Sequence, residues 1–205
     1  MMCLRFARLI ATCVFFAGTF AVSPGCTSSP DAKETVDSMG NFSLEIVKVK
    51  DSIDAAIKAL EHVVASEPSD INANVAGYAK AYTALEKQSK VVKSRAEEMR
   101  SKGDEFFKEW EAPASVSPER RAQLTASYGQ IKQEMTAAKE GFIPFLASLR
   151  DIQSYLKVDA TPTGIHSMGA LVTKAKENAA HVKTSIDAVL TQVNSVHGML
   201  STKSE

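Results

Sequence analysis

The sequence predicts an all-α protein whose four long helices form an elongated antiparallel up-down-up-down bundle with coiled-coil-like seams. After Asp31 the chain consists mainly of good helix formers, and its helix breakers gather in three short segments, 67–70, 112–118 and 159–164. Between these breaks, apolar residues recur at alternating steps of three and four, which is the heptad spacing of helices that pack at a shallow angle. Three turns between four helices favour the up-down-up-down order.

The first helix is expected to bury one apolar seam that begins at Phe42. The residues of this seam are Phe42, Ile46, Val49, Ile53, Ala56, Leu60 and Val63. Before Phe42 the pattern is interrupted by Gly40 and Asn41, two weak helix formers. The end of the bundle that carries the N-terminus is therefore expected to be nearly three-stranded.

The second helix is expected to start after the segment 67–70, where Ser69 or Asp70 can cap its first amide groups. Its seam residues are Ile71, Val75, Tyr78, Tyr82, Leu85, Ser89, Val92, Ala96, Met99, Gly103, Phe106 and Trp110. The seam ends at the segment 112–118, which predicts the next turn.

The third and fourth helices share one start signal. Ser117 precedes Pro118 and Thr161 precedes Pro162, and proline is favoured at the first position of a helix because its ring fixes φ and its missing amide is not needed there. The third seam is Leu124, Tyr128, Ile131, Met135, Ala138, Phe142, Phe145, Leu149, Ile152 and Leu156. The fourth is Ile165, Met168, Val172, Ala175, Ala179, Val182, Ile186, Val189, Val193, Val196 and Leu200.

Folding each helix back about its turn sets large seam residues opposite small ones, as close packing requires. The expected pairs are Gly103 with Tyr128, Ala96 with Met135, Ser89 with Phe142, Phe142 with Ala179, and Phe145 with Ala175. Phe142 is therefore expected to be packed between two small residues.

Residues 1–26 read as a signal peptide with a lipobox-like end. Arg5 and Arg8 form a basic start, and the apolar run 9–22 is right for a signal but short for a membrane span. All three cysteines lie in this segment, and the last, Cys26, is the candidate lipidation site. Residues 27–31 are expected to be a polar tether, and residues 32–205 a single helical domain.

Two other outcomes for the N-terminus remain open, because Ser23 stands where a lipobox usually has leucine. The chain could be cut after Ala21, or the segment could stay as an uncleaved anchor. If Cys26 is lipidated, the protein is exported to the periplasmic side of the cell envelope. The following Thr27, which is not aspartate, then favours the outer membrane over the inner membrane in a Gram-negative host.

Composition excludes several function classes. The chain has 24 basic and 24 acidic residues. Removal of Arg5 and Arg8 with the signal peptide would leave a net charge of −2, from 22 basic and 24 acidic residues. Such a balance predicts no nucleic-acid partner and no polybasic lipid site. Because no cysteine follows Cys26, the folded domain cannot depend on disulfides.

Candidate chemistry is sparse, and the sequence predicts no enzyme, no cofactor and no metal site. The four histidines, His62, His166, His181 and His197, are too scattered for a metal site. Glu177 and His181 lie four apart, which favours a solvated surface pair. No haem, phosphate-loop or nucleophile-elbow motif is present in the sequence.

Aromatic residues Phe106, Phe107 and Trp110 gather near the turn at 112–118. They could contact lipid headgroups at a membrane surface. Phe106 and Trp110 lie on the seam, however, so core packing is the preferred reading for both, and only Phe107 lies clearly off it.

Several segments resemble one known family. They are the end of the second helix from Gly103 to Glu111, the start of the third at Arg120 and Arg121, the stretch 145–151, and Tyr155 to Lys157. Together they resemble bacterial helical lipoproteins catalogued as the domain of unknown function numbered 2959. The resemblance implies an envelope lipoprotein and brings no catalytic residues.

The expected function is that of a membrane-anchored cell-envelope lipoprotein, a structural or protein-interaction module whose partner is another envelope protein. The alternative is a helical-bundle binding protein for a small apolar ligand or lipid. It would use loose space around Ser89, Gly103 and a kink at Pro144, which denies the Glu140 carbonyl its usual amide partner.

Overall fold

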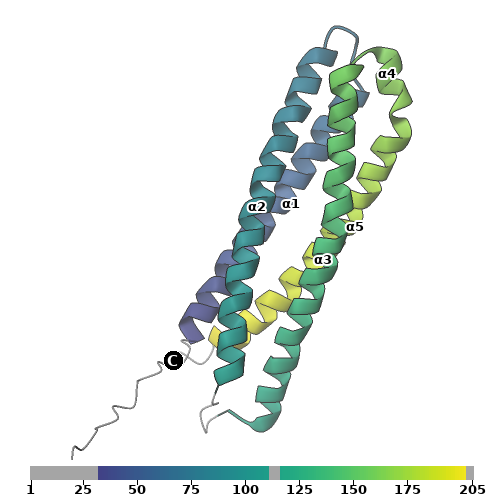
Figure 1. Ribbon diagram of the computed structural model, residues 1–205. Helices are drawn as coiled ribbons and strands as arrows, with labels where there is room; N and C mark the ends of the chain where they lie inside the picture. The colour runs from purple at the N-terminus through teal and green to yellow at the C-terminus, as the bar shows by residue number, and fades with distance from the viewer. Residues whose placement is uncertain (1–31, 111–115, 202–205) are drawn as a thin grey trace, which may run out of the picture.

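The computed structural model describes residues 32–110 and 116–201, and all regular secondary structure in these two ranges is helical (Figure 1). The helices are α1 (Ala32–Val64), α2 (Ile71–Glu109), α3 (Pro118–Val158), α4 (Pro162–Ser167) and α5 (Gly169–Ser201). The predicted all-α class is confirmed. The expected signal peptide, the tether and Cys26 lie outside the described residues.

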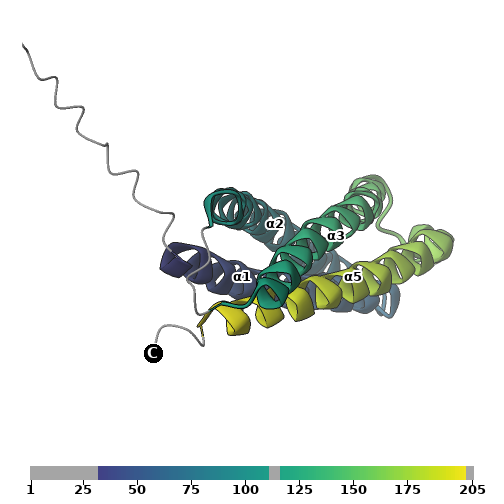
Figure 2. The same ribbon diagram turned by 90° about the horizontal axis from the view of Figure 1, so that it is seen from below.

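The long helices lie side by side in two closely packed pairs. Helix α1 packs most extensively on α2, and α3 packs on α5. The pairs are joined by α1 and α5, whereas α2 and α3 contact each other much less. Figure 2 shows the four long helices from one end. The core therefore runs along the whole length of the molecule, and one of its sides is packed less tightly than the others.

Burial confirms the predicted seams of α1, α4 and α5 at every position. The seams of α2 and α3 are buried toward their ends, but their middle residues are only half-buried. These are Ser89, Val92 and Ala96 of α2, and Met135, Ala138 and Phe142 of α3. Phe142, which was expected to be packed, lies against the core but is only half-buried. Its ring packs edge-on against Phe145, with centroids 6.0 Å apart, and keeps one side toward solvent.

The expected break at Gly40 does not occur, because α1 runs without interruption from Ala32. Met39 is fully buried, and Thr35 and Ser38 are buried as well. A glycine inside a helix costs about 1 kcal/mol, which is less than the roughly 1.5–3 kcal/mol gained by burying a side chain such as Met39. The expectation of a nearly three-stranded end is wrong for the part of the chain that the structure describes.

Two of the three predicted helix caps form. The Ser117 hydroxyl accepts a hydrogen bond from the Arg120 amide at 3.2 Å, and the Thr161 hydroxyl accepts one from the Gly164 amide at 3.1 Å. Asp70 stands at the start of α2, but its side chain makes no capping bond. That start depends instead on the backbone and on packing.

The predicted fourth helix is split into α4 and α5 at Met168. Before α4, the Asp159 carboxylate accepts hydrogen bonds from the Thr161 amide at 3.1 Å and the Thr161 hydroxyl at 2.6 Å. A Cβ atom on Gly164 would lie 2.4 Å from the carboxyl carbon of Asp159. A side chain at position 164 would therefore have to displace the Asp159 carboxylate from this turn.

Replacing Asp159 with alanine is expected to lower the melting temperature more at neutral than at acid pH. The two Thr161 bonds hold the pKa of Asp159 below its usual 3.8. A lowered folded-state pKa gives stability that is present above the unfolded-state pKa and is lost as pH falls through the folded-state pKa. Circular-dichroism melts near pH 7 and near pH 3 check this. The matched change Thr163→Ala should have little effect at either pH, and an equal loss for Asp159→Ala at both pH values would contradict the prediction.

Candidate functional site

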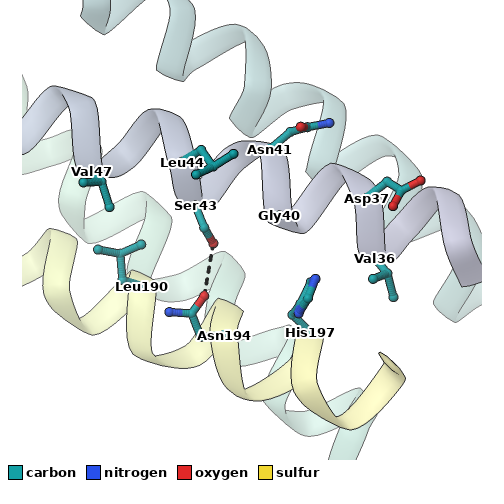
Figure 3. A pocket seen from close by; sticks show the side chains of 10 residues that line it. All are labelled: Val36, Asp37, Gly40, Asn41, Ser43, Leu44, Val47, Leu190, Asn194 and His197. Atoms are coloured by element: carbon teal, nitrogen blue, oxygen red, sulfur yellow. Dashed lines mark hydrogen bonds between the residues drawn. The ribbon is translucent and has the colours of Figure 1, made fainter. Parts of the chain in front are cut away.

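An open groove of about 620 Å³ lies between the first half of α1 and the end of α5 (Figure 3). Helix α1 contributes two turns that include Gly40, Ser43, Leu44 and Val47. Helix α5 contributes Leu190, Asn194 and His197. The volume falls in the range of ligand sites, although the groove is more open to solvent than an enclosed cavity is.

The groove has apolar side chains at both ends, Val47 and Leu190 at one and Val36 at the other, and polar side chains along its middle and beside Val36 (Figure 3). Val47 and Leu190 face each other across it, and the Ser43 hydroxyl donates a hydrogen bond to the Asn194 side-chain oxygen at 3.3 Å (Figure 3). The side chain of His197 points toward Gly40, where a Cβ atom would lie 3.7 Å from its Nε2. The missing side chain at Gly40 thus leaves a hollow in the α1 surface beside the imidazole.

Exposed leucine and valine side chains mark the α1 edge of the groove. Leu44 is 63 % exposed and Val47 is 48 % exposed. Complete burial of a leucine or valine side chain lowers the free energy by roughly 1.5–3 kcal/mol. This edge is therefore a candidate contact surface.

Ion pairs close the rest of the interface between α1 and α5. They join Lys50 to Asp187, Asp54 to Lys183 at 2.6 Å, and Glu61 to Lys176 at 2.5 Å. Each step along α1 is matched by an equal backward step along α5, so the two helices are antiparallel. Surface pairs of this kind contribute about 0–1 kcal/mol each. Their main consequence is positional, because the groove begins where this row of charges ends.

The predicted chemistry residues do not come together. Within residues 32–110 and 116–201, no three His, Cys, Asp or Glu side chains are placed to hold a metal ion. His197 lines the groove, whereas His181 lies near Gly141, where a Cβ atom would be 3.3 Å from its Nδ1. Glu177 and His181 are both exposed, and no hydrogen bond joins them in the described chain.

The aromatic cluster packs against the core, with Phe106 buried and with Phe107 and Trp110 half-buried. The Phe107 ring stacks on Tyr128 with centroids 4.6 Å apart and meets Trp110 edge-on at 5.9 Å. Phe106 stacks on Trp110 at 5.4 Å. Arg121 covers the same indole and donates a hydrogen bond to the Trp110 carbonyl at 2.6 Å. Phe106 is a buried core residue, and Phe107 is half-buried against Tyr128 and lies off the buried seam, both as predicted. Trp110, which was expected on the seam, is half-buried as well.

The expected loose space around Gly103 is filled by Tyr128. The Tyr128 hydroxyl donates to the Arg100 carbonyl at 2.9 Å and lies 3.1 Å from an Asp104 carboxylate oxygen. Burial, followed by the charge of Asp104, raises the pKa of Tyr128, so the hydroxyl stays protonated and remains a donor. The groove between α1 and α5 includes neither Gly103 nor Ser89 nor Pro144.

The sequence reading missed the groove, although a signal for it exists. A second set of residues on α1 recurs at alternating steps of four and three, on the side of the helix away from the core. Its members are Lys33, Asp37, Gly40, Leu44, Val47 and Asp51. Only the centre of this set is apolar, whereas the core seam of the same helix is apolar throughout. The core seam therefore dominates the hydrophobic pattern of the sequence.

No helix within the described ranges is long and apolar enough to cross a membrane. No curated protein and no solved structure matches the chain. The family model described as "Protein of unknown function (DUF2959)" matches residues 35–199, which span all four long helices. The chain therefore belongs to the DUF2959 family.

Proposed function

We propose that this protein is a cell-envelope lipoprotein, anchored by a lipid on Cys26, that acts through contact with another envelope protein and not by turnover. The basic start, the apolar run and the position of Cys26 in the sequence support the anchor. An extended chain spans at most about 3.5 Å per residue, so residues 27–31 would keep Ala32 within about 20 Å of the lipid. The protein would sit on the periplasmic side, with the outer membrane favoured over the inner.

The proposed body is an elongated antiparallel up-down-up-down bundle with coiled-coil-like seams. Support comes from the buried heptad positions of α1 and α5 and from the antiparallel row of ion pairs between them. A helix of the length of α1 spans about 50 Å at 1.5 Å per residue. Such a rod presents long side faces, which suit a structural or interaction role better than a deep ligand site does.

The observation that carries the proposed contact role is the exposed apolar edge at Leu44 and Val47. It lies beside a groove in the first half of α1, the half nearer to the tether. Exposed apolar surface next to a groove is typical of a surface that another protein covers. Lipidation would hold this surface close to the membrane.

Replacing Cys26 with serine tests the anchor and the contact together. The parent chain should fractionate with membranes, carry a diacylglyceryl group at its mature N-terminus, and crosslink repeatedly to one envelope protein in intact cells. The Cys26→Ser chain should be released or misprocessed and should lose that crosslink. A Cys26→Ser chain that stays with membranes, together with a parent N-terminus that carries no lipid, would overturn the anchor. A soluble parent cut after Ala21 would overturn it as well.

A second candidate function is the binding of a small apolar ligand or lipid. It is favoured by the half-buried seam in the middle of α2 and α3, where Val92, Met135 and Phe142 keep part of their apolar surface exposed. A lipid that stays bound to the purified protein after removal of membranes, identified by mass spectrometry, would support this candidate.

A further inference from the structure

The outward stripe on α1 has the form of a coiled-coil seam whose apolar centre is left largely exposed by the helices that the structure describes. We define the outward stripe as Lys33, Asp37, Gly40, Leu44, Val47 and Asp51. Alternating steps of four and three keep these residues on one side of the helix. Its centre is apolar and half-open, with Leu44 63 % exposed and Val47 48 % exposed. Its two ends are charged.

The stripe is complementary to itself when two copies of α1 run antiparallel. With the centre of the pairing between Gly40 and Leu44, the Leu44 of each copy faces the Gly40 of the other. The leucine side chain projects from the helix, and the absence of a side chain at Gly40 leaves a hollow beside it. A Cβ atom built on Gly40 would have its nearest contact, His197 Nε2, at 3.7 Å. Within the chain, Tyr128 packs against Gly103 in the same large-on-small manner.

The charges at the ends of the stripe favour the same register. Antiparallel pairing sets Lys33 of one copy opposite Asp51 of the other, and it brings Asp37 next to Val47 and Lys48. A parallel pairing would set Lys33 against Lys33 and Asp51 against Asp51, and like charges at facing positions are destabilising. Among the described residues, neither Asp37 nor Asp51 has an ion-pair partner within the chain, so a second copy could supply one for Asp51 and bring Lys48 near Asp37.

Going beyond the proposed function, we propose that this protein pairs with a second copy of itself through the outward stripe, with the two α1 helices antiparallel and each lying along the groove between α1 and α5 of the other copy. The pairing and a contact with another envelope protein through Leu44 and Val47 exclude each other, so the two would compete for this edge. The interface is isologous, because the same residues of both copies meet. Val47 and Leu190 supply apolar surface beside it. The pairing does not depend on the lipid. On a single membrane, however, the two tethers would point in opposite directions, so the pair would lie along the membrane surface.

Sedimentation of the full chain in mild detergent over a range of concentrations tests the surface. The parent should be a dimer that dissociates on dilution. Leu44→Asp should raise the dissociation constant by about tenfold or more, because it places a charge in the apolar centre. The matched control Leu171→Asp changes another leucine that is 40 % exposed, on a different face, and should behave like the parent. A parent that is monomeric at every concentration overturns the proposal, and so does a dimer that Leu44→Asp leaves intact.

A charge exchange tests the register. Lys33→Asp and Asp51→Lys should each weaken the dimer, and the chain that carries both changes should recover most of the lost affinity, because the opposite charges face each other again. Circular-dichroism spectra should show that all three chains are folded, so that the differences in dissociation constant report on the interface. If the double change weakens the dimer as much as the two single changes combined, the antiparallel register is wrong.

Discussion

Replacing Gly103 with alanine should destabilise the protein by about 1–3 kcal/mol. A Cβ atom at this position would lie 2.5 Å from three atoms of the Tyr128 side chain, which is closer than any real contact. The ring cannot move away easily. Its hydroxyl donates to the Arg100 carbonyl at 2.9 Å, and its face stacks on Phe107 at 4.6 Å. To relieve the clash, either α2 and α3 must move apart or these contacts must break.

The same substitution at Gly77 of α2 is the matched control and should have the opposite sign. No atom lies within 4 Å of a Cβ built on Gly77, which is exposed. Alanine there should stabilise the helix by about 0.5–1 kcal/mol because glycine pays a larger entropy cost on folding. Urea unfolding of the two variants measures the difference. If Gly103→Ala also raised the unfolding midpoint, the close contact with Tyr128 would be absent in solution.

The sequence predicted burial correctly where the burial of a residue depends only on which side of its helix it occupies. The seams of α1 and α5 follow from heptad spacing, and all their residues are buried, from Phe42 to Val63 and from Val172 to Leu200. The contact of Gly103 with Tyr128 also follows from the sequence, because the position of the turn fixes which residues of α2 and α3 meet. Spacing and breakers are local properties, so they can be read without the fold.

The distance between helices could not be predicted in the same way. Heptad spacing tells which side of α2 faces α3, but side-chain size and crossing angle decide how closely they approach. In the middle of these helices the small residues Ser89, Ala96 and Ala138 provide little apolar surface to draw them together. The large residues Met135 and Phe142 therefore remain half-exposed. This is a property of the whole assembly and not of any one segment.

The groove was missed for a different reason. The core seam of α1 is so regular that Gly40 and Asn41 looked like an interruption, whereas Gly40 belongs to the second stripe on the same helix. The break at Met168 between α4 and α5 was also missed, because the apolar pattern continues through it from Ile165 to Val172. A pattern of buried positions can survive a short interruption of the helix that carries it.

Three alanine-to-leucine changes in α5 should reveal how tightly α3 and α5 pack. Ala175→Leu should cost about 1–3 kcal/mol, because Ala175 and Phe145, which the predicted register sets opposite it, are both fully buried and leave little space for a larger side chain. Ala179→Leu should cost less. Ala179 is buried, but Phe142, which the predicted register sets opposite it, is only half-buried, so its ring could turn outward. Ala180→Leu is the control, since it places leucine at an exposed position of the same helix.

The urea unfolding midpoint should therefore be highest for Ala180→Leu, lower for Ala179→Leu and lowest for Ala175→Leu. The free energy of unfolding of Ala180→Leu should lie within about 0.5 kcal/mol of the parent value. Helix propensity cannot produce this order, because all three changes replace alanine with leucine inside one helix. Only the space opposite each position differs. Two contacts between α3 and α5 agree with the predicted register to within a few residues. Gly141 lies against His181, and the Asn178 side chain donates a hydrogen bond to the Ser148 hydroxyl. Equal losses at Ala175 and Ala179 would show that Phe142 is held as firmly as Phe145, and that the middle of the rod is closed in solution.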